Sequence, residues 1–327
     1  MSKFGALPDG RRVDIHRMSA GDLSASVLTL GAILNDLRVG DRPLALGSPD
    51  VGPYAGRMGH FGAIMGPVVN RLSGAAAEID GTRHSFEPKE GKSYTQHSGS
   101  AGIHRKVWQV VRKRRREIVL AVEMPDGEGG FPGNRRLTAT WTLDAGGLTL
   151  TLEAETDAPT LMNPAFHGYW NLTGAPDWGG HRLQVLAERW LPTDADDLPT
   201  GGILPTAGGL RDFRAPRTVT PRDTPKLDHN FCLAAARGPR RPAVRLEGGG
   251  MALTVETTAP GVQVFDMGTI DLGDVPTHHG HGYRPYAGLA FEPQMWPDAP
   301  AHPAFPSILL GPGETFRQET RFAVAPL

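Results

Sequence analysis

Two residues of the sequence could supply a proton-transfer pair, His167 and Glu292. His167 lies in NPAFHGYWNLTG (residues 163 to 174), and Glu292 lies in GLAFEPQ (residues 288 to 294). A histidine and a carboxylate in different environments can act as acid and base near neutral pH. Each residue also has a structural interpretation, because a histidine among aromatic side chains can fill a core and a buried glutamate can pair with an arginine. Spacing alone does not bring the two side chains together.

The other charged or glycine-rich motifs favour turns over metal, nucleotide or nucleic-acid sites. The basic run RKRRRE (112 to 117) falls where a hairpin connection is expected and has no interleaved aromatic residues. The histidines of THHGHGYRPY (277 to 286) lack paired cysteines or helical spacing, so we expect a loop there, which could close over a cleft. DGEGGFPGN (126 to 134) lacks the calcium-loop pattern, and no phosphate-binding GxxxxGK occurs. We therefore expect neither a cofactor nor a metal.

Composition points to a protein that acts on a small, largely neutral ligand. The chain has 327 residues with a formal net charge of -1, which gives no general attraction to nucleic acid or anionic lipid. A single cysteine, Cys232, excludes an intramolecular disulfide and suits a reducing compartment. No apolar run has the length of a signal peptide or a membrane span. We expect a cytoplasmic protein, either a monomer or a homodimer, with no nucleic-acid or membrane partner.

The elements that must position the candidate residues are predicted to be strands. LTATWTL (137 to 143) and LTLTLEAET (148 to 156) alternate apolar and polar residues, and DAGG between them predicts a hairpin. The same period of two recurs along the chain, whereas helical periodicity is almost absent. We therefore predict an all-β fold, a large antiparallel β-sandwich formed by residues 1 to 327 as a single domain.

Eight segments in order resemble motifs of the aldose 1-epimerases, the galactose mutarotase family. HGYWNLTG (167 to 174) is similar to the family's HxYFNLxG, LDHNF (227 to 231) to DHNF, and DGEGGFPGN to DGEEGFPG. The remaining segments are FGALPDGRRV (4 to 13), NRLSGAAAEIDG (70 to 81), QHSGSAGIHRKVW (96 to 108), LPTGGILPT (198 to 206) with RDFR (211 to 214), and FEPQMWPDAPAHPAFPSILLGPGE (291 to 314). The resemblance covers nearly the whole chain.

This resemblance implies a galactose mutarotase-like supersandwich with a sugar cleft, and a cofactor-independent isomerase that interconverts the α and β anomers of an aldohexose. By the family pattern, His167 is the general acid, Glu292 the general base and His97 a second imidazole at the substrate. The implied sugar-binding residues are Asn70, Arg71, Asp228 and Gln263. Trp296, and less so Trp170, are candidates for an aromatic surface against the sugar.

Departures from the family pattern leave the choice of aldose open. Gly66-Pro67 replaces a Gly-Arg pair, Gln96 and Ser98 replace a Leu and a Gly, Trp170 replaces a Phe, and Ala301 replaces an Asn. We expect these positions to cluster around the cleft, where small changes alter substrate preference. Two alternatives remain: a hexose-phosphate 1-epimerase, which would need an extra basic cluster at the cleft, and a non-catalytic sugar-binding module on the same fold.

Overall fold

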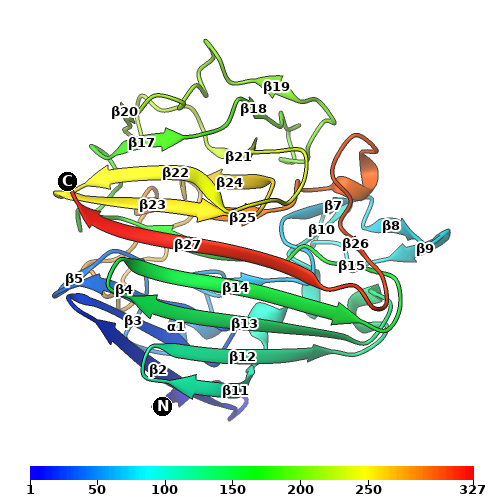
Figure 1. Cartoon of the computed structure of the whole chain (residues 1–327), viewed down its shortest axis with the longest axis horizontal. Helices are drawn as coiled ribbons and strands as arrows, with labels where there is room; N and C mark the ends of the chain where they lie inside the picture. The colour runs from blue at the N-terminus through cyan, green and yellow to red at the C-terminus, as the bar shows by residue number, and fades with distance from the viewer.

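A computed structural model describes residues 1–327, and its largest element is a nine-stranded antiparallel sheet. Figure 1 shows the long strands of this sheet side by side as one curved layer. In spatial order the strands are β11 (Gln109–Arg114), β12 (Glu117–Met124), β13 (Arg135–Asp144), β14 (Gly147–Thr156), β27 (Phe316–Pro326), β23 (Met251–Thr257), β22 (Arg241–Gly248), β17 (Arg182–Val185) and β20 (Arg217–Thr218).

A second, seven-stranded sheet carries the candidate catalytic residues. Its strands are, in spatial order, β19 (Leu204–Pro205), β18 (Arg189–Trp190), β21 (Asp228–Cys232), β24 (Gly261–Phe265), β25 (Leu289–Gln294), β16 (Ala165–Trp170) and β6 (Ala63–Met65). The first five strands of the chain form a third sheet. They are β1 (Ser2–Ala6), β2 (Arg12–Ala20), β3 (Leu23–Leu28), β4 (Leu34–Val39) and β5 (Arg42–Pro43).

The remaining elements are short. Three two-stranded sheets pair β7 (Arg71–Ser73) with β10 (Tyr94–Gln96), β8 (Ala76–Ile79) with β9 (Thr82–Ser85), and β15 (Thr160–Leu161) with β26 (Leu309–Leu310). The helical segments are α1 (Gly52–Ala55) and the 3-10 turns η1 (Gly99–Ala101), η2 (Ile103–Arg105), η3 (Glu128–Gly130) and η4 (Ala299–Ala301). None of these helices approaches the length and apolar character of a membrane span.

The predicted all-β fold and the predicted hairpin are confirmed. β13 and β14 pair in antiparallel register, from Asp144 opposite Gly147 to Arg135 opposite Thr156. Along β13 every second side chain is buried, as the sequence pattern requires when one face of a sheet packs on a core. The basic run also lies at a hairpin, because β11 ends at Arg114 and β12 begins at Glu117.

Alternation along the seven-stranded sheet sorts its side chains onto two faces. Phe166, Trp170 and Phe291 belong to the main hydrophobic core, together with the inward side chains of the nine-stranded sheet. Successive strand residues point to opposite faces, so His167 and Glu292 must point away from this core. The alternation along the strands therefore places both residues on the face of the seven-stranded sheet that points away from the main core.

Candidate active site

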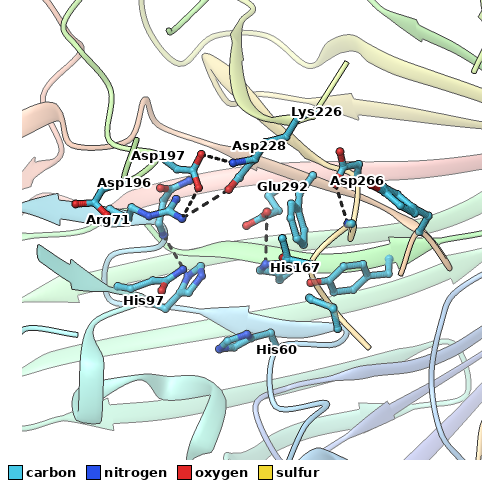
Figure 2. A pocket seen from close by; sticks show the side chains of 18 of the residues that line it. His60, Arg71, His97, His167, Asp196, Asp197, Lys226, Asp228, Asp266 and Glu292 are labelled. Atoms are coloured by element: carbon cyan, nitrogen blue, oxygen red, sulfur yellow. Dashed lines mark hydrogen bonds and ion pairs between the residues drawn. The ribbon is translucent and has the colours of Figure 1, made fainter. Parts of the chain in front are cut away.

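His167 and Glu292 meet because their strands are neighbours. β16 pairs with β25 through Gly168 opposite Phe291 and Tyr169 opposite Ala290, and one further step of this register sets His167 opposite Glu292. His167 Nε2 lies 3.5 Å from Glu292 Oε1. The structure therefore brings together the two residues that sequence spacing alone leaves apart, and Figure 2 shows their side chains pointing toward one another.

Burial shifts the pKa values of both members of this pair. The side chains of His167 and Glu292 are only 6% and 3% exposed. Loss of solvent lowers the pKa of His167 to about 3, with a further contribution from the neighbouring His60. The same loss raises the pKa of Glu292 well above its usual range, against the attraction of Arg71. A lowered imidazolium pKa makes a stronger acid and a raised carboxylate pKa makes a stronger base.

Two adjacent backbone segments present Asn70 and His97 to the same site, because Asn70 directly precedes β7 and His97 directly follows its partner β10. Both residues have left-handed backbone conformations, with φ of 64° and 50°, which are uncommon for non-glycine residues. The His97 N–H donates to the Asn70 carbonyl at 2.8 Å, and the Asn70 N–H donates to His97 Nδ1 at 3.2 Å. Because Nδ1 accepts this bond, the neutral ring carries its proton on Nε2. His97 is thereby prepared to donate a hydrogen bond.

Arg71, Asp228 and Gln263 form a polar chain beside Glu292. Gln263 lies directly opposite Glu292 in the pairing of β24 with β25, and its side-chain amide donates to Asp228 Oδ1 at 2.6 Å. Arg71 Nη2 lies 3.6 Å from Asp228 Oδ2 and 3.5 Å from Asp197 Oδ2. The Nε of Arg71 and the Oε1 of Gln263 are buried with no hydrogen-bond partner. The chain therefore fixes Asp228 while Arg71 keeps an unused donor.

These side chains line a cleft of about 710 Å³, within the usual range for small-molecule sites. Six of the residues that we expected at the site line this cleft: His167, Glu292, His97, Asn70, Arg71 and Asp228. Gln263 is 3% exposed and lies outside the lining, behind Asp228. Aromatic side chains also line the cleft, namely Tyr94, Tyr169, Trp178, Phe265 and Tyr286.

Several sequence expectations about the cleft wall differ from the structure. Trp296 lies outside the cleft lining, where its indole N–H donates to the Pro260 carbonyl and its ring packs on Phe305. Trp170 is fully buried in the core. The histidine loop does not line the cleft; His278 contacts Asn35, and the other two histidines pack near Tyr283. An aromatic residue can pack in the core or line the cleft, and its type alone does not show which face of a strand it occupies.

Most positions that depart from the family pattern lie outside the cleft lining, although we expected them to cluster around the cleft. Gln96 lines the cleft, whereas Pro67, Ser98, Trp170 and Ala301 do not. Sequence reasoning also missed His60, Asp197 and Lys226, all of which line the cleft. His60 lies outside the quoted motifs, whereas Asp197 and Lys226 each lie one residue before a motif, LPTGGILPT and LDHNF, which could have pointed to them. No group of three or more His, Cys, Asp or Glu side chains is arranged to hold a metal ion.

Comparison with known proteins identifies the family of this chain. Residues 14–323 match the aldose 1-epimerase family model. The chain is 32% identical to galactose mutarotase from Rattus norvegicus over 98% of each chain, and 31% identical to aldose 1-epimerase from Escherichia coli (strain K12) over 96% of each chain.

Solved structures show the same fold. A GalM/aldose epimerase homologue from C. elegans superposes with a TM-score of 0.89 at 24% identity, over 96% of this chain and 99% of that one. Galactose 1-epimerase from Lactobacillus acidophilus gives 0.86 at 23% identity, over 99% and 97%. The family model and the relatives span nearly the whole chain, and this protein therefore belongs to the aldose 1-epimerase family.

Proposed function

We propose that this protein is an aldose 1-epimerase that interconverts the α and β anomers of an aldohexose. The observation that carries the proposal is the buried pair of His167 and Glu292, 3.5 Å apart on the sheet face that lines the cleft. Mutarotation requires one proton to leave the anomeric hydroxyl and one to reach the ring oxygen. A base and an acid held this close can serve both atoms of one sugar.

Ring opening uses the pair in one direction. Glu292 takes the proton of the anomeric hydroxyl, and the oxygen's electrons form the carbonyl bond as the bond between the anomeric carbon and the ring oxygen breaks. The lowered pKa of His167 and the raised pKa of Glu292 favour the proton on the carboxyl group at rest, and its transfer across the 3.5 Å between Glu292 Oε1 and His167 Nε2 gives the imidazolium and the carboxylate without changing the proton count. The protonated imidazole of His167 then gives its proton to the departing ring oxygen. The products are an open-chain aldehyde, a protonated Glu292 and a neutral His167, so both charges disappear together.

Ring closure reverses these transfers after the aldehyde has turned. Rotation about the bond between the first two carbons presents the other face of the carbonyl to the same hydroxyl. His167 then removes the hydroxyl proton as that oxygen attacks, and Glu292 returns its proton to the carbonyl oxygen. The opposite anomer forms and the pair regains its starting protonation, so no cofactor enters the cycle.

The surrounding polar groups suit the hydroxyls of a sugar. We assign Asn70, the Arg71 guanidinium and the Nε2–H of His97 as donors to sugar oxygens, and Asp228 as an acceptor. Gln263 acts through Asp228, which it holds by the 2.6 Å hydrogen bond. Charge-assisted hydrogen bonds of this kind are the stronger ones available to a hydroxyl-rich ligand.

A neutral sugar fits the cleft better than a sugar phosphate. Lys92 is paired with Asp196, and Lys226 Nζ lies 2.6 Å from Asp197 Oδ1, so two of the lysines on the cleft wall are already neutralised. A phosphate would have to compete with these carboxylates for its cations. We therefore place hexose-phosphate epimerisation second.

We also propose that the chain works as one domain in the cytoplasm. The cleft takes residues from Arg57 in the first quarter of the chain to Glu292 near its end, so no shorter segment holds the whole site. Cys232 is buried and unpaired, which suits a reducing compartment.

Polarimetry tests the function. Freshly dissolved α-D-galactose and α-D-glucose should approach anomeric equilibrium faster with the wild-type protein, and His167→Ala should lose about 10²-fold to 10⁴-fold of that acceleration. Acceleration only with glucose 6-phosphate or galactose 6-phosphate would favour the phosphate alternative. Tight sugar binding with no acceleration of any of these would favour a non-catalytic binding module.

A further inference from the structure

His60 lines the cleft but has no part in the proton transfers described above. It lies in the turn before β6 and is half-buried. Figure 2 shows it beneath His97 and His167, and its ring centroid lies 5.1 Å from that of His97 and 5.9 Å from that of His167. The same ring, together with Arg57, also lines a second cavity of about 470 Å³. His60 therefore forms part of the wall between the two cavities.

The imidazole of His167 lacks the hydrogen bond that usually fixes a catalytic histidine. Its Nδ1 is buried and has no partner. A histidine that works at one nitrogen is commonly oriented by a bond at the other. Here aromatic rings flank His167 instead: Tyr169 stacks at 5.0 Å with an interplanar angle of 29°, and His60 stacks at 5.9 Å with an angle of 20°.

The backbone ties His60 to His167. The Gly62 N–H donates to the His167 carbonyl at 2.9 Å, and Ala63 lies opposite His167 in the pairing of β6 with β16. Gly62 has φ of +67°, and a Cβ at this position would lie 2.2 Å from the Leu34 carbonyl oxygen. Only glycine fits this turn without displacement, so the turn holds His60 at a fixed distance from the β16 backbone.

We propose that His60 is a positioning residue, one face of an aromatic clamp that holds the His167 imidazole in the orientation required for proton transfer to the sugar. This inference rests on the proposed function, because it assigns His60 a role in that reaction. Tyr169 forms the other face of the clamp. A flat, neutral ring suits this role, since a permanent cation at this position would repel the protonated His167.

The charge state of His60 agrees with the clamp. Burial lowers the pKa of His60 to about 4, so the ring is uncharged at neutral pH. An uncharged imidazole can stack on His167 in both of its protonation states.

Three substitutions of His60 test separately the contributions of its flat ring, its ring nitrogens and its volume. His60→Phe keeps a flat ring, His60→Leu fills the space without one, and His60→Ala removes the side chain. Misplacing a catalytic group by about 1 Å can cost about 10²-fold in rate, so we expect kcat for anomer interconversion to fall at least about tenfold in the Leu and Ala variants. KM should change far less, and His60→Phe should retain most of kcat. His84→Ala, in β9 outside both cavities, is the matched control.

The outcomes distinguish this inference from the function on which it rests. A wild-type protein with no activity on any aldose would contradict the function itself. Wild-type activity with an unchanged kcat in His60→Leu would overturn the clamp, and so would equal losses in the Phe and Leu variants, because the nitrogens would then be what matters. The Leu and Phe comparison is sufficient even if His60→Ala does not fold. A split between Phe and Leu in kcat with constant KM supports the clamp.

Discussion

At the residue scale, burial without a strong partner is what gives His167 and Glu292 their chemistry. Glu292 Oε2 and His167 Nδ1 are both buried with no hydrogen-bond partner. Unpaired buried groups cost stability, of order 1–3 kcal/mol each, and proteins retain them where they serve a function. Arg71, the cation whose charge acts on Glu292, is instead placed beside Asp197 and Asp228. The structural interpretation of Glu292 as an arginine partner is therefore not what the structure shows.

Asp228 should contribute to sugar binding more than to proton transfer. In Asp228→Asn the shape is kept but the charge that faces Arg71 and the sugar hydroxyls is lost. Charge-assisted hydrogen bonds contribute about 1.5–3 kcal/mol, so we expect KM to rise about tenfold or more, with a smaller change in kcat. Steady-state mutarotation kinetics measure both constants. Asp22→Asn, at the exposed turn between β2 and β3, controls for the loss of one carboxylate; a tenfold loss of kcat at constant KM would place Asp228 in the chemistry instead.

At the scale of elements, strand phase is what assembles the site. The alternation of apolar and polar residues predicts the strands, and the phase within β16 and β25 puts His167 and Glu292 on the face opposite Phe166 and Phe291. The order of strands in the sheet depends instead on contacts between distant segments, which no local pattern contains. Sequence motifs could therefore name the proposed catalytic pair, while its 3.5 Å separation required the fold.

Gln263 and His60 also show that sequence motifs do not determine contacts between distant segments. Gln263 shares a strand face with Glu292, but its amide turns toward Asp228 and leaves it outside the cleft. His60 acts through a ring contact with a residue more than a hundred positions away. Such contacts are set by tertiary packing, so sequence spacing indicates neither of them.

Ser98, one of the departures from the family pattern, ties the segment that carries His97 to the segment that carries Asn70. Its hydroxyl accepts from the Val68 N–H and donates to the Val68 carbonyl, each at 2.9 Å, and the residue is buried. Ser98→Ala leaves both backbone groups unpaired, so we expect the free energy of unfolding to fall by about 1–3 kcal/mol. Urea denaturation of this variant beside Ser85→Ala, which is exposed on β9, checks the value. Equal stability of the two variants would contradict this role.

At the scale of the whole molecule, the histidines make stability depend on pH. Burial is the largest cause of a lowered pKa at nine of them: His16, His60, His97, His104, His167, His181, His229, His278 and His279. Below about pH 6.5 these side chains bind protons in the unfolded chain before they do in the folded one, so protonation favours unfolding. Four buried carboxyl groups, Asp228, Asp266, Glu292 and Asp298, have raised pKa values and act in the opposite direction.

The histidines outnumber these carboxyl groups, so the protein should lose stability as the pH falls. Each such histidine can contribute up to about 1.4 kcal/mol per pH unit between pH 6.5 and its folded pKa. We expect the urea midpoint to be lower at pH 5.5 than at pH 7.5, and to change little between pH 7.5 and pH 8.5, where none of these imidazoles titrates. A midpoint that stays constant or rises on acidification would contradict this account of the buried histidines.

The central claim, that Glu292 and His167 exchange protons with the sugar, can be tested at equilibrium. Two-dimensional NMR exchange spectroscopy on the anomeric protons of D-galactose measures interconversion without any net change in composition. We predict strong exchange between the α and β signals with the wild-type protein, and a loss of about 10²-fold to 10⁴-fold in Glu292→Gln, which keeps the side-chain shape but cannot accept the proton. Exchange in a folded Glu292→Gln at the wild-type rate would contradict the mechanism.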